Sequence, residues 1–347
     1  MSINSILRGD GLILNDIFNE NSKFNRDNIF DPYISLKNKL NKYGVNIWTK
    51  DFNNLGDIAF EIHQDFQNYT LSTKNYLLLF ETKFIKPNNW NFDKIKKYNK
   101  IFTWDDDIID NNKFFKINIP NRLESSPIDG FSKRTIFCCL IASNKNLKQT
   151  SINNLYAERI KIIKWFELNA PLDFNLYGNN WNKPTRKVGL SGYLEHKFYD
   201  NLNLNANSKY FFPSNRGQIF SKKSILNSTK FSICYENVSN LKGYISEKIF
   251  DSFNSGCVPI YWGAINITAH IPEECFIDRR NFKSHRDLYL YLRSITENRY
   301  IDYQTKINNF LTGKSAFPFS SSYFANTIVN QIKFDFNLRT KLNEVAP

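Results

Sequence analysis

Residues 231–263, FSICYENVSNLKGYISEKIFDSFNSGCVPIYWG, carry polar side chains of the types that bind an anion. Glu236 and Asn237 directly follow an apolar run, and Glu247 and Lys248 stand where a helix is expected to begin. A cation is disfavoured in the first turn of a helix, because the helix dipole is positive at that end. A lysine beside the free N–H groups of a helix start can instead bind phosphate. The pattern therefore indicates either a phosphate site or a surface lysine that is merely tolerated there.

A strand, a loop and a helix must position these side chains. Residues 231–235 form a short apolar run typical of a buried strand, and the polar residues 236–244 predict a loop. Ser246 is placed to cap a helix whose apolar residues recur at helical spacing, and Gly256 ends it before a second strand. In parallel α/β sheets, ligands bind beyond the carboxyl ends of the strands. The side chains expected in that crevice are Glu236, Asn237, Tyr244, Glu247 and Lys248.

Size and charge limit the class of protein. The chain has 347 residues, and single cores stop growing at roughly 250–300 residues, so we expect two domains. A hydrophobic content of 41% supplies ample core. The net charge of +13 favours anionic partners such as nucleotides or an acidic membrane surface, although general enrichment in Lys and Asn explains it equally well. Because no arginine-rich or basic–aromatic tract occurs, we expect no nucleic-acid partner.

Cysteine and histidine give no sign of a metal site. The five cysteines form no CxxC pair and are typical of small buried hydrophobic residues in a reducing compartment. The four histidines are far apart in the sequence, without the spacing of metal ligands. The N-terminus lacks the pattern of a signal peptide, and no apolar stretch is long enough to span a membrane. We expect a cytoplasmic protein, with peripheral association at the inner membrane face as a further option.

Strand-like and helix-like segments alternate along the chain, which predicts an α/β fold with two Rossmann-like domains. The polar, Pro- and Gly-containing residues 121–132 are the expected linker. We therefore predict an N-terminal domain at 1–125, a C-terminal domain at 126–330 and a tail at 331–347. The clearest predicted elements are strands at 76–80, 101–104 and 134–143 and a helix at 155–169.

The segment that opened this section resembles the donor-binding motif of the α-1,3-fucosyltransferases, family 10 of the glycosyltransferases. It carries the Glu-Asn pair at 236, Tyr244, the Glu-Lys pair at 247 and the terminal Val-Pro-Ile-Tyr-Trp-Gly. Three outer segments extend the resemblance: FIDRRNF at 276–282, LIASN at 140–144 with Arg159 downstream, and residues 80–107. The resemblance thus covers residues 76–296 and is strongest at 231–263.

The resemblance implies a GT-B fold, in which two Rossmann-like domains face each other and the active site lies in the crevice between them. It implies an N-terminal domain that binds the acceptor and a C-terminal domain that binds the nucleotide sugar. The implied reaction moves L-fucose from GDP-fucose to a glycan acceptor with inversion, without a metal or other cofactor. The same fold acting on another sugar nucleotide, or an inactive glycan-binding protein, are the alternatives. Such a transfer needs a base for the acceptor hydroxyl and positive charge for the leaving pyrophosphate.

The family motif suggests roles for the matching residues, each with a structural alternative. Lys248 and Arg159 are expected at the pyrophosphate, although either could be an ordinary cation on a helix surface. Glu247 is expected to accept hydrogen bonds from sugar or ribose hydroxyls, or simply to favour the helix dipole. The remaining donor-site candidates, which could instead order loops, form turns or pack, are Ser143, Asn144, Glu236, Asn237 and Tyr244.

Glu81 is the candidate catalytic base, because it directly follows the predicted strand at 76–80. The residues around it depart from the family pattern, since many members have glycine and asparagine around the glutamate and this chain has Phe80-Glu81-Thr82-Lys83. The alternative is a glutamate that caps a loop or pairs with Lys83. Asp105–Asp107 resembles a metal-binding DxD motif, but we interpret it as a polar loop at a strand end.

Overall fold

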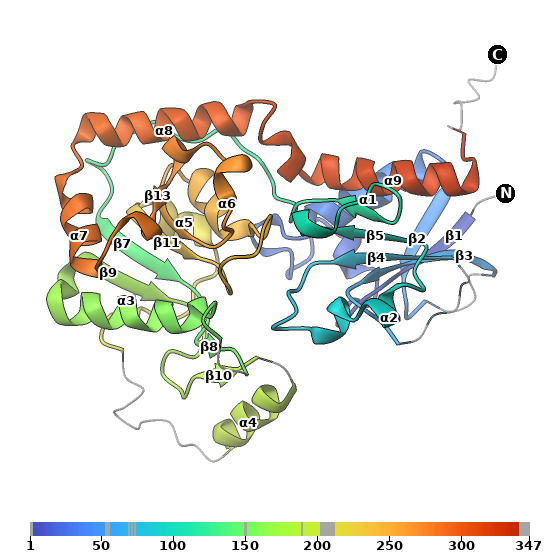
Figure 1. Cartoon of the computed structure of the whole chain (residues 1–347), viewed down its shortest axis with the longest axis horizontal. Helices are drawn as coiled ribbons and strands as arrows, with labels where there is room; N and C mark the ends of the chain where they lie inside the picture. Colours follow the sequence, from blue (N-terminus) through green and yellow to red (C-terminus); the bar gives the residue numbers. More distant parts are fainter. Residues whose placement is uncertain are drawn as a thin grey trace. The chain divides into compact units, whose positions relative to one another are not determined.

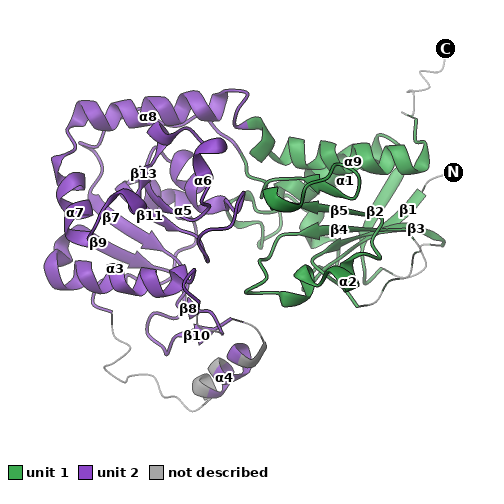
Figure 2. Cartoon of the chain, viewed as in Figure 1, with its two compact units in different colours: residues 1–122, 317–347 green, residues 123–316 purple. Residues whose placement is uncertain are grey.

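The computed structural model describes residues 3–52, 56–68, 70, 72, 74–148, 151–188, 190–201 and 212–339. The chain divides into unit 1, Met1–Arg122 with Phe317–Pro347, and unit 2, Leu123–Ala316 (Figure 2). The boundary falls inside the predicted linker. Residues 317–330 differ from the expected division, because they belong with unit 1 and not with the C-terminal domain. The cause is helix α9, Ser321–Phe336, which buries Phe324 and Ile328 in the core of unit 1.

Unit 1 is built on a six-stranded sheet in the order β2-β1-β3-β4-β5-β6, in which all neighbouring strands are parallel (Figure 1). Alternate residues of β4 face opposite sides, as strand geometry requires. Tyr76 and Leu78 pack into the core that contains α9, whereas Leu77 and Leu79 pack against Ile95 of α2. The elements are β1 Ile3–Arg8, α1 Asp31–Asn41, β2 Val45–Thr49, β3 Ile58–Gln64, β4 Asn75–Leu79, α2 Phe92–Ile95, β5 Lys100–Thr103 and β6 Phe114–Lys116.

Unit 2 is built on a second parallel sheet, in the order β13-β12-β11-β7-β9 (Figure 1). Its strands are β7 Ile136–Ile141, β9 Phe174–Tyr177, β11 Thr229–Tyr235, β12 Val258–Trp262 and β13 Ile277–Asp278, with β8 Lys145–Asn146 and β10 Arg186–Lys187 paired separately. Its helices are α3 Leu155–Asn169, α4 Leu190–Asn201, α5 Lys222–Asn227, α6 Glu247–Phe253, α7 His285–Ser294 and α8 Glu297–Thr312.

The strand order of unit 2 reverses between β7 and β11. From β7 the chain moves outward to β9, then returns to the other side of β7 and continues through β11, β12 and β13. The carboxyl ends of the two strands at such a switch point are where doubly wound sheets bind their ligands. Residues 142–144 and 236–237, which follow β7 and β11, therefore stand at the expected ligand-binding edge.

The predicted helix at 155–169 is confirmed as α3. Helix α5 is short, with only six residues, whereas α8 and α9 each span 16 residues. All five cysteines are free and buried, as predicted. Within the described ranges, no helix has both the length and the apolar character needed to cross a membrane.

Candidate functional site

Glu236 is the centre of the polar cluster at the end of β11. Its side chain is fully buried, and its Oε1 accepts a hydrogen bond of 2.7 Å from the backbone N–H of Ser246. Its Oε2 accepts one of 2.6 Å from the Ser246 hydroxyl and one of 3.1 Å from Nζ of Lys248. Glu236 thus joins the end of the strand to the start of helix α6, and the alternative of a merely loop-ordering role describes only part of what it does.

Ser246 occupies the predicted N-cap position of α6, but its hydroxyl does not cap the helix. The hydroxyl donates to Glu236 and accepts a 2.8 Å hydrogen bond from Lys248. Helix α6 spans only seven residues, so it offers a smaller dipole than a long helix would. The charges at the start of α6 are therefore mainly those of its side chains.

Lys248 is a partly buried cation between two carboxylates. Its side chain is 19% exposed, with Nζ 3.1 Å from Oε2 of Glu236 and 3.8 Å from Oε1 of Glu247. Burial alone would lower the pKa of Lys248, but Glu236 and Glu247 outweigh that effect and raise the pKa. The ammonium group is therefore held in its charged form in a fixed position, which is not the behaviour of a surface lysine.

Glu247 lies between two lysines. Its Oε1 is 3.8 Å from Nζ of both Lys248 and Lys222, and its side chain is 44% exposed. Desolvation would raise the pKa of Glu247, but the two cations outweigh it and lower the pKa to about 2. Lys222 also pairs with Asp251 at 2.7 Å. Sequence reasoning missed Lys222, because nothing in the local pattern before α5 distinguishes it from an ordinary exposed lysine.

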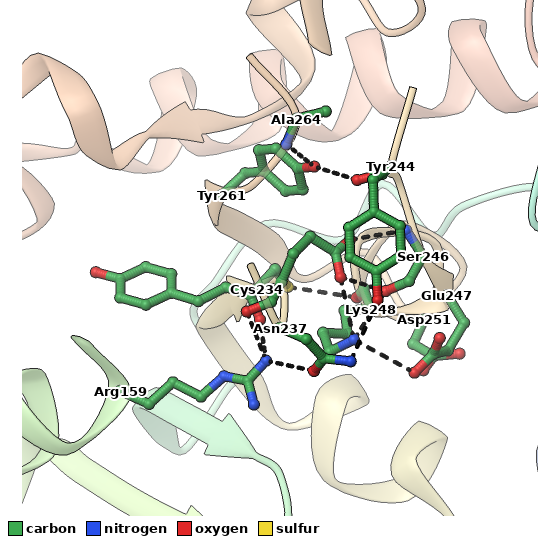
Figure 3. Close-up of polar contacts among 12 residues, drawn as sticks. Arg159, Cys234, Asn237, Tyr244, Ser246, Glu247, Lys248, Asp251, Tyr261 and Ala264 are labelled. Atoms are coloured by element: carbon green, nitrogen blue, oxygen red, sulfur yellow. Dashed lines mark hydrogen bonds and ion pairs between the residues drawn. The ribbon is translucent and has the colours of Figure 1, made fainter. Parts of the chain in front are cut away.

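Arg159 points inward from α3, and the interpretation as a helix-surface arginine is wrong. The residue is 5% exposed, and its Nη2 donates to the carbonyl oxygens of Tyr235, at 2.5 Å, and Glu236, at 2.8 Å. A third hydrogen bond, of 3.2 Å, reaches Oδ1 of Asn237. Burial lowers the pKa of Arg159, although a guanidinium remains charged in proteins. Arg159 thus places a cation beside the carboxyl end of β11 (Figure 3).

Asn237 connects Arg159 to Tyr244. Its Oδ1 accepts from Arg159, and its Nδ2 donates to the hydroxyl of Tyr244 at 3.2 Å (Figure 3). Tyr244 is almost completely buried, so the packing alternative describes its ring better than an open stacking surface does. The structure therefore brings five predicted donor-site residues together with Arg159 in one connected cluster. These five are Glu236, Asn237, Tyr244, Glu247 and Lys248.

Ser143 and Asn144 follow β7, the strand beside β11. The buried amide Nδ2 of Asn144 donates to the carbonyl oxygens of Asn180, at 3.1 Å, and Lys183, at 3.0 Å. These bonds join the end of β7 to the loop after β9, whereas the structural alternative for Ser143 and Asn144 was the formation of a turn. No hydrogen bond that we find between described residues joins Ser143 or Asn144 to the cluster around Glu236. The support for a role of Ser143 and Asn144 in binding the donor is their place after β7, the strand that pairs with β11.

Glu81 belongs to unit 1, where it follows β4 as predicted. Its residue is partly exposed, its backbone N–H donates to Oδ1 of Asp65 at 3.2 Å, and its carbonyl oxygen accepts from Nε1 of Trp90 at 3.0 Å. The backbone of the candidate base is thus fixed by side chains. These contacts involve no atom of the Glu81 carboxylate, so its role as the base stays a prediction.

The Asp105–Asp107 run follows β5 and Trp104 and forms a short capped turn. The Asp105 side chain accepts from the backbone N–H of Asp107, and Asp106 pairs with Lys116 at 2.5 Å. Over the residues that the structure describes, no group of three or more His, Cys, Asp and Glu side chains is placed to hold a metal ion. The aspartates are therefore used in local capping and pairing.

The doubly wound parallel sheet of unit 2 thus holds a lysine and an arginine at its switch point, where sheets of this kind bind their ligands. The profile of glycosyltransferase family 10 (fucosyltransferase), C-terminal region, matches residues 131–317, more than half of the chain. The chain belongs to this family.

Similar proteins agree with this assignment. The α-(1,3)-fucosyltransferase FucT of Helicobacter pylori is 32% identical over 100 residues, which make up 28% of this chain and 20% of FucT. The match thus spans about a fifth of the length of this curated relative. A crystal structure of an α1,3-fucosyltransferase with GDP has a TM-score of 0.56 and 15% identity over 96% of this chain and 91% of its own. An α-glucosyltransferase bound to UDP-glucose and DNA has a TM-score of 0.53 and 10% identity over 95% and 98%. These neighbours establish a GT-B fold.

The lowered pKa of Glu247 predicts how stability depends on pH. A carboxylate with a depressed pKa stabilises the folded chain above its unfolded value, 4.5, and this contribution is lost as the pH falls towards about 2. Glu247→Gln should therefore lower Tm modestly at about pH 7, because the side chain is partly exposed, and the difference from the parent should shrink towards about pH 3. Thermal unfolding across this range measures it, with Glu273→Gln, at an exposed site of the same unit, as control. A difference in Tm that does not change with pH would contradict the prediction.

Proposed function

We propose that this protein is an inverting fucosyltransferase that moves L-fucose from GDP-fucose to a glycan acceptor. The observation that carries the proposal is the Lys248–Glu236 pair with Arg159 at the switch point of unit 2, in a chain of family 10. Two comparisons support the sugar and the nucleotide. The Helicobacter pylori relative is an α-(1,3)-fucosyltransferase, and the structural neighbour of the same activity contains GDP.

The charges of the cluster suit a diphosphate leaving group. Lys248, Arg159 and Lys222 contribute +3, and three carboxylates contribute −3, so the cluster as a whole is neutral. An anion is therefore not drawn in by excess charge. It would be bound by cations whose positions the carboxylates fix, and such preorganised charge stabilises the developing negative charge of the leaving group without rearrangement. The carboxylates of the cluster are Glu236, Glu247 and Asp251.

The acceptor half of the reaction is assigned to unit 1. An acceptor hydroxyl attacks the anomeric carbon of fucose, and its proton passes to the carboxylate of Glu81. As the new carbon–oxygen bond forms, the bond from the anomeric carbon to the phosphate oxygen breaks, and GDP leaves with the electron pair. A single displacement of this kind inverts the configuration at that carbon. We also propose that the reaction needs no metal or other cofactor, because Lys248 and Arg159 supply the positive charge.

Two alternatives remain. The glucosyltransferase neighbour has the same fold and its structure contains UDP-glucose, so the fold alone does not select the donor. A glycan-binding protein without activity would keep the fold but would release no nucleotide. A single assay distinguishes each alternative from the proposed function.

A panel of sugar nucleotides tests the proposal. GDP-fucose should raise Tm and release GDP in the presence of a glycan acceptor, because a ligand that binds only the folded state stabilises it. UDP-glucose and UDP-galactose should neither raise Tm nor release UDP, and the release of GDP from GDP-fucose should be the same with EDTA present. Equal stabilisation by UDP-glucose would overturn the donor, and activity that EDTA abolishes and Mn²⁺ restores would overturn the metal-free mechanism. Stabilisation by GDP-fucose without any transfer, over a broad set of glycan acceptors, would favour the inactive glycan-binding protein.

Removing the ammonium group should affect the diphosphate specifically. Lys248→Ala should weaken GDP by roughly ten- to hundredfold in Kd and guanosine far less, because a charge-assisted hydrogen bond contributes roughly 1.5–3 kcal/mol. The same change leaves the buried Glu236 carboxylate without its cation, which is strongly destabilising. Lys248→Met is therefore also compared with its parent in a Glu236→Gln background, and Lys223→Ala, an exposed neighbour of Lys222, is the control. If each lysine variant binds GDP as its parent does, Lys248 does not contact the phosphates.

Glu81→Gln keeps the size of the side chain and removes its basicity. Sugar transfer should fall by roughly 10²–10⁴-fold, the usual contribution of a general base, while the Kd for GDP stays unchanged because the donor groups belong to unit 2. The measurements are GDP release and GDP affinity on the same preparation. Glu20→Gln, at an exposed site of unit 1, controls for the loss of a charge. Turnover near that of the parent would exclude Glu81 as the base.

A further inference from the structure

All four backbone polar groups of the Phe80–Glu81 dipeptide are bonded by side chains. The N–H groups of Phe80 and Glu81 both donate to Oδ1 of Asp65, each at 3.2 Å. The carbonyl oxygen of Phe80 accepts from Nε1 of Trp104 at 2.8 Å, and that of Glu81 accepts from Nε1 of Trp90 at 3.0 Å. Backbone groups beyond the end of a strand lose their ladder partners, and water commonly replaces them. Here one carboxylate and two indoles hold the chain instead, and Nδ2 of Asn89 also donates to the Glu81 carbonyl oxygen at 3.3 Å.

The two indoles form a rigid support. The rings of Trp90 and Trp104 lie with their centroids 5.4 Å apart at an interplanar angle of 52°, and Trp104 is almost fully buried. A tryptophan has one hydrogen-bond donor, and these two direct theirs to consecutive carbonyl oxygens. The dipeptide is thus fixed on its carbonyl side by groups that have little freedom to move.

Asp65, which binds the two N–H groups of the dipeptide, is itself held in place by several contacts. The residue follows β3, is 2% exposed and adopts a left-handed backbone conformation with φ of 60°. Its own N–H donates to the carbonyl oxygen of Leu78 in β4 at 2.9 Å, which places it beside the end of that strand. Its Oδ1 also accepts from Nδ2 of Asn89 at 2.7 Å, and its Oδ2 pairs with Lys86 at 3.1 Å.

These features are costly unless something requires them. A buried carboxylate loses its hydration, which costs several kcal/mol before its partners offset the loss. A left-handed conformation at a residue other than glycine adds a further but smaller cost, since aspartate tolerates this conformation better than most residues do. In Asp65 both costs fall at one point, and the groups that the carboxylate serves are the backbone N–H groups of Phe80 and Glu81.

We propose that Asp65 is a positioning residue for sugar transfer, which acts by fixing the backbone from which the Glu81 carboxylate extends. This inference rests on the proposed function, in which Glu81 is the base. A general base must lie within about 3 Å of the proton that it removes. A displacement of about 1 Å can cost roughly 10²-fold in rate, so the anchoring of this backbone bears directly on turnover.

The test is a double-mutant cycle with Asp65→Asn and Glu81→Gln. In Asp65, Oδ1 accepts from backbone N–H groups and Oδ2 faces the Lys86 ammonium, so both oxygens face donors. The NH₂ group of an asparagine would therefore face a donor in either orientation of its amide. Asp65→Asn should lower kcat roughly ten- to hundredfold and leave the Kd for GDP unchanged. In the Glu81→Gln background, the same substitution should change kcat by less than about twofold. A loss of equal size in both backgrounds would show a general structural role and overturn the inference.

Two further variants keep the test decisive. Asp335→Asn is the control, because Asp335 is another carboxylate of unit 1 that is mostly shielded from solvent, with a side chain 16% exposed, and it is bonded to Lys100 and to the hydroxyl of Tyr76, each at 2.7 Å. It should lower Tm and leave kcat near that of the parent. If Asp65→Asn does not fold, Trp90→Phe removes one bond to Glu81 and keeps an aromatic ring. It should lower kcat several-fold with Glu81 present and hardly at all with Gln in its place, and an equal loss in both backgrounds overturns the inference here too.

The outcomes separate this inference from the function on which it rests. If Glu81→Gln alone turns over like the parent, the proposed base and the positioning role both fall. If Glu81→Gln loses turnover but Asp65→Asn acts equally in both backgrounds, the base stands and only the positioning role falls. If Asp335→Asn lowers kcat as much as Asp65→Asn does, the effect comes from lost stability in unit 1, and the positioning role is overturned.

Discussion

The buried ion pair between Lys248 and Glu236 is the interaction on which the candidate donor site depends. It joins the end of β11 to the start of α6 through a carboxylate that also binds both the N–H and the hydroxyl of Ser246. Burying both charges is expensive, and only the complete set of partners makes it tolerable. Because Glu236 and Glu247 raise the pKa of Lys248, its ammonium group is charged and bonded in the absence of a ligand. Arg159 and Asn237 are bonded to each other and to the same end of β11, so their positions also depend on this connection.

Unit 1 contains a similar arrangement. Its strand order reverses between β1 and β3, and Asp65 directly follows β3 as Glu236 directly follows β11 in unit 2. Each carboxylate is buried, accepts backbone N–H groups and is balanced by a lysine, Lys86 for Asp65 and Lys248 for Glu236. The two differ in what they hold. Glu236 fixes the Lys248 cation, whereas Asp65 fixes the backbone of Glu81, a second carboxylate. A cation and a carboxylate base are the two kinds of group that the proposed reaction needs.

Local patterns predicted the elements that carry the site better than the contacts within it. The strand at 231–235 and the helix at 155–169 follow from short-range periodicity, and the family motif predicted which side chains gather around Glu236. Asp65 and Lys222 were missed, because each acts on residues far along the chain and stands in a segment without a motif. The Ser246 hydroxyl was expected to cap its helix, but Glu236 binds it instead. The return of α9 to unit 1 depends on tertiary packing, which no local window contains.

The neutrality of the cluster in unit 2 has a consequence for how a diphosphate would bind. Each cation already has a carboxylate or carbonyl partner, so bulk charge does not determine affinity, even though the whole chain carries +13. A ligand gains only from donors that remain on the Lys248 ammonium and the Arg159 guanidinium after their internal bonds are made. Those donors have fixed directions, so the site selects by geometry and needs little rearrangement when charge develops on a leaving group. In the proposed reaction, selectivity for the sugar and the base would then come from the loops around the cluster, while the ion pair would serve the departure of the diphosphate, a step common to nucleotide-sugar donors.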